Sequence, residues 1–212
     1  MHKVPLRAAF LIVLGLLAAC ANDQGRDFAR YYDAEGLFTL NLPAANDVTV
    51  TEPQSGTEGP DLLTGVVSSP PAPSPSPASA FGGGFGAAEE PPDQTVYQAF
   101  AVDAQDFDDL DEMALFFLTG DPVIDVVIDD RARMGGDEAR LIVADVNNGG
   151  TVTAGVAAAM TLGDGETGYL IAAVFPPGDW DAEQADFRRI VSSFRSSVPP
   201  GLRTFPVNEQ AS

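Results

Sequence analysis

The sequence predicts an α+β fold, in which a central antiparallel β-sheet carries helices packed on it. Apolar and polar residues alternate in several segments, as at Phe38, Leu40 and Leu42, and this is the period of a half-buried strand. Turns rich in glycine and asparagine over 147–150 and 163–168 join such segments as hairpins. Two further segments carry apolar residues at helical spacing.

The first strands are short. Residues 36–43 form the first strand, which stops at Pro43 because proline has no N–H to donate to a sheet. Residues 48–51 form the second strand after a turn-sized gap, and residues 61–67 form a third. The preceding segment, 21–32, is expected to be a tether or a short helix.

A low-complexity insertion over 68–93 interrupts the strand pattern. Its 26 residues include seven prolines, five serines and four glycines, so we expect polyproline II in one part, flexible chain in the other and disorder overall. A tolerated surface insertion is the simplest interpretation, because loop-closure entropy grows slowly with length. The alternative is that Phe81 and Phe85 contact a partner.

The second half of the chain carries both helices. The first starts near Asp106, a residue type favoured at the N-cap, and ends before Gly120. Its apolar face comprises Phe107, Leu110, Ala114, Phe117 and Leu118. The expected strands around and after it are 95–103, 123–129, 139–146, 151–162 and 169–175. The last helix covers about 181–196, capped by Asp179 or Asp181, and residues 198–212 form a loose tail.

The N-terminus has the pattern of a secretory signal. Lys3 and Arg7 precede an apolar run over 8–19, which is too short to span a bilayer as a helix. The end of this run resembles the lipobox of bacterial lipoproteins: Leu17-Ala18-Ala19-Cys20. The resemblance implies cleavage between Ala19 and Cys20, and lipidation of Cys20. The alternative is an ordinary signal peptide with an incidental cysteine.

The chain is therefore expected to have four parts. A signal peptide over 1–19 precedes a lipidated tether over 20–35. One α+β domain covers 36–197 and includes the insertion, and the tail follows.

Composition excludes several classes of function. Loss of the signal would remove His2 and Lys3, the only histidine and lysine, and lipidation would consume Cys20, the only cysteine. Histidine-dependent triads, Schiff-base lysines and zinc sites of histidine or thiolate are then ruled out. Losing Lys3 and Arg7 changes the formal net charge from −20 to −22. Such a chain is a poor partner for nucleic acid, and its charge argues against the domain lying flat on an anionic lipid surface. We expect no cofactor.

Acidic residues cluster at the start of the first helix. The candidate cation-binding residues are Asp103, Asp106, Asp108 and Asp109. An EF-hand loop starting at Asp106 would need an acid at its fifth position and glycine at its sixth, where Leu110 and Asp111 stand. Charge complementing the helix dipole is the favoured interpretation, and a weak cation surface is the alternative.

Three other motifs receive structural interpretations. The GxGxxG match at 163–168 is followed by a strand, not by the helix of a dinucleotide site, and so predicts a hairpin. The mixed charges of 129–133 and 137–138 predict a solvated turn with local ion pairs. Trp180 is expected to pack onto the sheet at the start of the last helix.

Several short motifs together resemble the PsbP/Mog-like superfamily, including its DcrB-like periplasmic lipoproteins. These motifs are Phe38-Thr39-Leu40-Asn41-Leu42-Pro43, Gly136-Asp137-Glu138-Ala139 and Phe187-Arg188-Arg189-Ile190-Val191-Ser192-Ser193-Phe194. The resemblance implies a sandwich of an antiparallel sheet and helices over about 36–197, in accessory or binding proteins without known catalysis. It supplies no catalytic residues.

We therefore expect an envelope lipoprotein that is a non-catalytic accessory or binding protein with an envelope protein as partner. Ala21 follows the lipobox cysteine, and by the sorting rule of enteric lipoproteins this implies the periplasmic face of the outer membrane in a Gram-negative cell. The alternatives are a carboxylate-dependent hydrolase, which needs two acids about 5–10 Å apart, a cation-binding protein, and a purely structural envelope protein.

Overall fold

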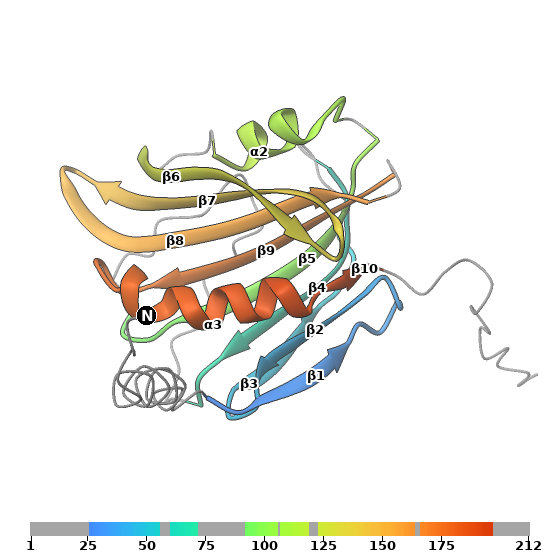
Figure 1. The fold of residues 1–212 in the computed structure, drawn as a ribbon, viewed down its shortest axis with the longest axis horizontal. Helices are drawn as coiled ribbons and strands as arrows, with labels where there is room; N and C mark the ends of the chain where they lie inside the picture. Colours follow the sequence, from blue (N-terminus) through green and yellow to red (C-terminus); the bar gives the residue numbers. More distant parts are fainter. Residues whose placement is uncertain are drawn as a thin grey trace, which may run out of the picture.

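Two antiparallel sheets and two helices make up the part of the protein that the computed structural model describes (Figure 1), namely residues 26–55, 60–71, 92–105, 107–118, 123–163 and 166–196. The seven-stranded sheet has the order β3-β4-β5-β9-β8-β7-β6, and the three-stranded sheet has the order β1-β2-β10. The strands of the large sheet are β3 (Asp47–Thr51), β4 (Leu62–Ser69), β5 (Val96–Asp103), β6 (Val123–Met134), β7 (Asp137–Asn148), β8 (Thr151–Leu162) and β9 (Thr167–Phe175). Those of the small sheet are β1 (Phe28–Tyr32), β2 (Phe38–Pro43) and β10 (Arg195–Ser196).

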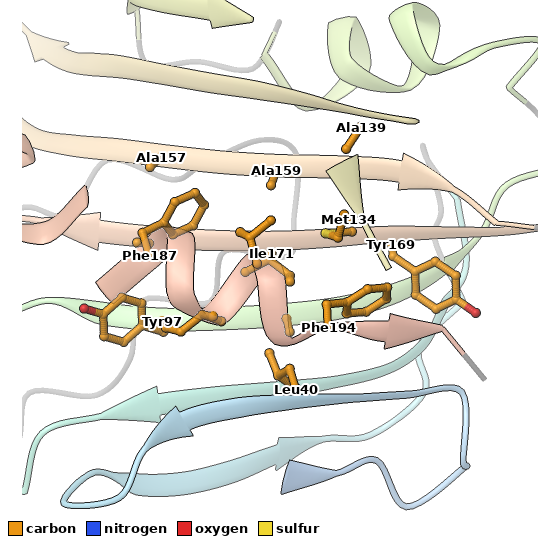
Figure 2. Close-up of a cluster of buried hydrophobic side chains, with 14 of the residues drawn as sticks. Leu40, Tyr97, Met134, Ala139, Ala157, Ala159, Tyr169, Ile171, Phe187 and Phe194 are labelled. Atoms are coloured by element: carbon orange, nitrogen blue, oxygen red, sulfur yellow. The ribbon is translucent and has the colours of Figure 1, made fainter. Parts of the chain in front are cut away.

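The large sheet separates two apolar cores because side chains alternate along each strand. On β5, Ala99 and Ala101 face one core, whereas Phe100 and Val102 face the other. Helix α3 (Trp180–Ser193) and β2 cover the first core, and α2 (Leu110–Leu118) covers the second. Figure 2 shows Phe187 and Phe194 of the α3 region lying over Ile171 and Ala157 of the sheet. The expected sheet with helices packed on it is confirmed.

Small residues in the centre of the sheet make room for large ones. Gly155 of β8 lies opposite Phe175 of β9, and a Cβ at Gly155 would stand 2.1 Å from the ring. Farther along the pair, Ala157 faces Ala173 and Ala158 faces Ala172. This stretch of β8 and β9 therefore leaves space on one face for the rings of α3.

Helix α2 begins with a side-chain cap, whereas α3 begins without one. The Asp109 carbonyl accepts the Met113 N–H at 3.2 Å, and the Asp109 carboxylate accepts the Glu112 N–H at 2.8 Å. At α3, Asp179 is the N-cap residue, but its side chain makes no capping hydrogen bond. The Trp180 ring packs against Phe175 and Phe187 at centroid distances of 6.0 and 6.1 Å, which confirms its expected place on the sheet.

Five local expectations are wrong. Helix α2 begins at Leu110 and not near Asp106. Residues 28–32 form β1 and pair with β2, so this part of the expected tether is a strand. Strand β4 reaches Ser69, so the insertion cannot begin at 68. Residues 129–133 belong to β6 and not to a turn, although they do form ion pairs. The last helix ends at Ser193 because residues 195–196 pair with β2 as β10.

The turn after β2 carries the chain from one sheet to the other, since β2 pairs with β1 and β10 whereas β3 pairs with β4. The hairpin expected at 163–168 is confirmed, because β8 and β9 pair with Leu162 opposite Gly168. The expected signal peptide and lipobox, most of the expected insertion and the expected tail lie outside the described residues. Among the described residues, no helix has the length and apolar character needed to cross a membrane.

Candidate functional site

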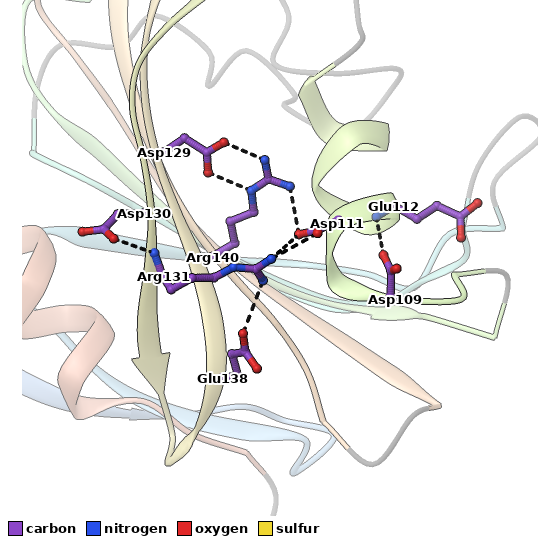
Figure 3. A network of polar contacts seen from close by, with 8 residues as sticks. All are labelled: Asp109, Asp111, Glu112, Asp129, Asp130, Arg131, Glu138 and Arg140. Carbon is purple, nitrogen blue, oxygen red and sulfur yellow. Dashed lines mark hydrogen bonds and ion pairs between the residues drawn. The ribbon is translucent and has the colours of Figure 1, made fainter.

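A network of carboxylates and arginines connects α2 to the edge hairpin of the large sheet (Figure 3). Arg140 of β7 binds Asp129 of β6 through two hydrogen bonds, of 2.8 and 2.6 Å. It also contacts Asp111 of α2 at 3.1 Å. Arg131 of β6 donates to both oxygens of Asp111, at 2.8 and 3.1 Å, and lies 3.4 Å from Glu138. We call Asp111, Asp129, Arg131, Glu138 and Arg140 the carboxylate–arginine network.

The register of the hairpin explains why Asp111 is needed. Arg131 and Arg140 stand directly opposite each other across β6 and β7, and two like charges in such a pair destabilise a sheet. Helix α2 lies over this part of the sheet and places Asp111 within hydrogen-bond distance of both arginines. One carboxylate therefore bridges two cations that the strands bring together.

Ion pairing changes the pKa values within this network. The hydrogen bond from Arg140 lowers the pKa of Asp129 against a smaller opposing effect of burial. The same bond raises the pKa of Arg140. A general acid at neutral pH needs a carboxyl with a raised pKa, so Asp129 is tuned in the opposite direction. Asp129 is therefore a poor general acid at neutral pH.

An open hollow of about 420 Å³ adjoins the network. Its lining consists of Asp109, Leu110, Asp111, Arg131, Asp137, Glu138 and Leu162. Four of these seven residues are acids and one is an arginine, while two leucines add apolar surface. A second hollow, of about 440 Å³, borders Arg131, Ala132, Arg133 and Glu138. The two hollows share Arg131 and Glu138, but the acids gather in the first, because the second is lined by two arginines and one acid.

The residues expected to bind a cation are only partly brought together. Asp103 ends β5 and accepts the Gln105 N–H at 3.0 Å, whereas Asp108 and Asp109 precede α2. Asp106 lies outside the described residues, as do Ala19 and Cys20. In the described part of the chain, no group of three or more histidine, cysteine, aspartate or glutamate side chains is placed to hold a metal ion. Cation binding by these four aspartates stays a prediction.

The sequence analysis missed a second polar cluster, beneath the start of α3. Tyr97 donates a hydrogen bond of 2.7 Å to Glu183, and Arg26 contacts both Tyr97, at 3.0 Å, and Glu183, at 3.3 Å. Arg26 also lies 3.2 Å from Asp186. The sequence did contain a signal for this cluster: Glu183 falls four residues before Phe187, on the apolar stripe of the helix. A carboxylate at such a position needs a buried donor.

Comparison with known proteins concerns the fold alone. No family model matches the chain, and no curated protein sequence matches it. Among solved structures it is similar to cyanobacterial PsbP (CyanoP) from Synechocystis sp. PCC 6803, with a TM-score of 0.54 and 14% identity over 84% of this chain and 96% of that chain. The fold is PsbP/Mog1-like.

Two other solved structures are similar at lower scores. The Ran-binding protein Mog1p of Saccharomyces cerevisiae gives a TM-score of 0.46 and 16% identity over 81% of this chain and 96% of its own. LpqN of Mycobacterium tuberculosis, involved in cell envelope biogenesis, gives 0.42 and 14% over 86% and 97%. The similarity to CyanoP confirms the PsbP-like fold expected from the sequence motifs, while the lipobox lies outside these comparisons.

Proposed function

We propose that this protein is a lipid-anchored envelope protein that binds a basic segment of another envelope protein, without catalysing a reaction. The observation that carries the proposal is the open hollow beside the carboxylate–arginine network. Its shape is held by Asp111, which ties α2 to both strands of the edge hairpin. The hollow is therefore built before a partner arrives, and binding a preformed surface costs little ordering entropy.

Charge identifies the kind of partner. Asp109, Asp111, Asp137 and Glu138 line the hollow with Arg131 as the only cation among its lining residues. Asp111 is paired with Arg131 and Arg140, and Glu138 lies 3.4 Å from Arg131. Asp137 and Glu138 stand beside the turn between β6 and β7, and both side chains are exposed. An acidic surface of this kind speeds the approach of a basic partner and disfavours acidic ones. Lysine and arginine stems would also cover Leu110 and Leu162.

The anchor rests on the lipobox, Leu17-Ala18-Ala19-Cys20. A diacylglyceryl thioether together with an N-acyl chain gives stable anchoring, since two chains already suffice. With Ala21 next in the chain, we place the protein on the periplasmic face of the outer membrane of a Gram-negative cell. Cys20→Ala should convert it into a soluble periplasmic protein. Retention of that variant in the membrane fraction would contradict the lipid anchor.

The partner is sought by crosslinking in intact cells, followed by affinity purification and mass spectrometry. We expect Asp137→Asn with Glu138→Gln to abolish a specific crosslinked protein that carries a basic segment. The matched control is Glu35→Gln with Asp47→Asn, which removes two exposed acids elsewhere and should leave the crosslink unchanged. Loss of the crosslink in a strain lacking residues 72–91, with no loss in the D137N/E138Q strain, would assign the contact to the insertion and contradict this proposal.

A further inference from the structure

We propose that the outward face of the three-stranded sheet rests on anionic lipid headgroups of the membrane that holds the anchor. This inference depends on the lipid anchor of the proposed function and adds an orientation to it. The surface consists of Arg30 and Tyr32 of β1, Arg195 of β10 and Arg189 of α3, together with Phe28, which packs partly against the first core and lies under Arg189. We call these five residues the arginine face.

Strand register places the side chains of the small sheet on one side. Phe38, Leu40 and Leu42 of β2 point into the first core, so Thr39 and Asn41 point outward. Arg30 stands opposite Asn41, and both Tyr32 and Arg195 stand opposite Thr39. Residues directly opposite in an antiparallel pair share a face. Arg30, Tyr32 and Arg195 are therefore neighbours on the outward side.

The side-chain contacts agree with this register. Arg30 donates to the Thr39 hydroxyl and to the Ser193 carbonyl, the latter at 2.8 Å. The Arg189 guanidinium lies 4.4 Å from the centre of the Phe28 ring, and Arg195 donates to the Ser192 carbonyl at 3.0 Å. These partners are uncharged. They orient each guanidinium group but do not neutralise its positive charge.

Charge is segregated in this protein. Residues 28–32, 38–43 and 187–196 contain four arginines and no aspartate or glutamate, in a chain whose formal net charge is −20. The negative net charge led us to expect no contact between the domain and an anionic lipid surface. Net charge, however, does not show how charged residues are distributed over the protein. Tyr32 has 71% of its surface exposed beside these arginines, and such a ring suits a membrane interface because one part is apolar and its tip is polar.

The anchor ends close to this face. Six peptide steps separate Cys20 from Arg26, a span of at most about 20 Å when fully extended. Arg26 is held by Glu183 and Asp186 at 3.3 and 3.2 Å, and β1 begins two residues later. The strand that carries Arg30 and Tyr32 is thus the first element that the anchor brings to the membrane surface.

The α2 side of the acid-rich hollow lies across the molecule from the small sheet, since in Figure 1 β1 and β2 are at the lower edge and α2 is at the upper edge. The other side of the hollow, at the turn between β6 and β7, reaches β10: a Cβ at Gly135 would stand 3.1 Å from the Phe194 ring and 3.6 Å from the Ser196 nitrogen. Contact of the arginine face with lipid would therefore turn Asp109 and Asp111 of the hollow away from the headgroups, and that side stays open to a basic partner.

The test uses the full-length lipidated protein in vesicles that contain phosphatidylglycerol. Because lipidation occupies Cys20, an introduced cysteine can carry the sole free thiol for a fluorescent label. Tyr32→Cys places the label on the arginine face, and Val127→Cys places it on β6, at a residue 63% exposed. Lipids with a quencher in the headgroup should quench the label at 32 strongly and the label at 127 weakly.

Arginine variants test whether the arginines cause the small sheet to dock on the lipid. Arg189→Gln with Arg195→Gln should lower the ratio of docked to undocked molecules roughly fivefold per arginine, so that quenching at 32 falls toward the level at 127. The matched control, Arg131→Gln with Arg133→Gln, and the charge-retaining R189K/R195K pair should keep the strong quenching. Raising the ionic strength to about 1 M, where the Debye length is about 3 Å, should abolish it.

Two failures are distinguishable. A protein that does not co-float with the vesicles would overturn the lipid anchor, and this proposal with it. A protein that co-floats but shows equal quenching at 32 and 127, or quenching that R189Q/R195Q leaves unchanged, would overturn the orientation alone.

Discussion

Tyr97 donates a 2.7 Å hydrogen bond to the carboxylate of Glu183 and so joins β5 to α3 across 86 residues of sequence. Tyr97 is 1% exposed and Glu183 is 9% exposed. Removing the phenol oxygen would leave a nearly buried carboxylate without one of its donors. We expect Tyr97→Phe to lower the free energy of unfolding by about 1–3 kcal/mol, measured by urea denaturation.

Tyr31 offers a matched control for that variant. Its hydroxyl is buried and has no hydrogen-bond partner in the described part of the structure. Tyr31→Phe removes the same atom without breaking a bond, so its stability should equal or slightly exceed that of the parent protein. Equal losses in both variants would contradict the assigned hydrogen bond.

The same bond predicts a loss of stability at high pH. Burial, together with the hydrogen bond and negative charge of Glu183, raises the pKa of Tyr97 above its ordinary value of 10.0. Burial also raises the pKa of Tyr31. The unfolded chain then releases these protons before the folded protein does, so stability is complete below pH 10 and falls above it.

For each tyrosine the slope approaches about 1.4 kcal/mol per pH unit. Urea titrations from pH 8 upward should show the decline in the parent protein. The decline should be shallower in Tyr97→Phe, whereas an unchanged slope in that variant would argue against a raised pKa at Tyr97.

The ion pair between Asp129 and Arg140 predicts how the stability of the fold changes at low pH. The pKa of Asp129 is lowered from the ordinary 3.8, chiefly by the hydrogen bond from Arg140. The resulting stabilisation is present above pH 3.8 and is lost as the pH falls through the lowered pKa. Its size is modest, roughly 0–1 kcal/mol, because the pair is near the surface. Asp129→Asn should flatten the acid limb of the stability curve.

The control for that measurement is Asp130→Asn. Asp130 accepts only the neighbouring Arg131 N–H among its described hydrogen bonds, and it takes no part in the bidentate pair. Its substitution should leave the acid limb unchanged. An acid limb that responds equally to both substitutions would show that the effect comes from total charge.

Gly155 predicts a packing defect. A Cβ at this position would stand 2.1 Å from the Phe175 ring, so the ring must move out of a well-filled core. Overpacking of this kind costs about 1–3 kcal/mol, and Gly155→Ala should lower the melting temperature accordingly. Gly155→Ala should cost less stability in a Phe175→Leu background than in the parent protein, because the smaller side chain at 175 leaves room for the methyl group. Additive losses would count against the close approach.

Secondary structure was largely readable from the sequence because its signals are local. The alternation of Phe38, Leu40 and Leu42 predicts a strand with one buried face, and the structure buries these three side chains. The glycines of 163–168 predict a hairpin, and β8 pairs with β9. Where local signals were weak the prediction was wrong: nothing in Phe28–Tyr32 distinguishes an edge strand from a tether, since the pairing of this segment depends on β2.

The sequence by itself determined the α+β class, the order of most elements and the expectation of a lipidated Cys20. The tertiary structure alone decided which charges meet. Arg26 finds Glu183 across 157 residues and Arg140 finds Asp111 across 29, and Arg30 and Arg195 are gathered by strands from both ends of the domain. Such encounters depend on sheet order and register, which no short window of sequence records. An overall charge of −20 therefore concealed two features: the segments 28–32, 38–43 and 187–196, which hold four arginines and no acids, and an acidic hollow lined by Arg131.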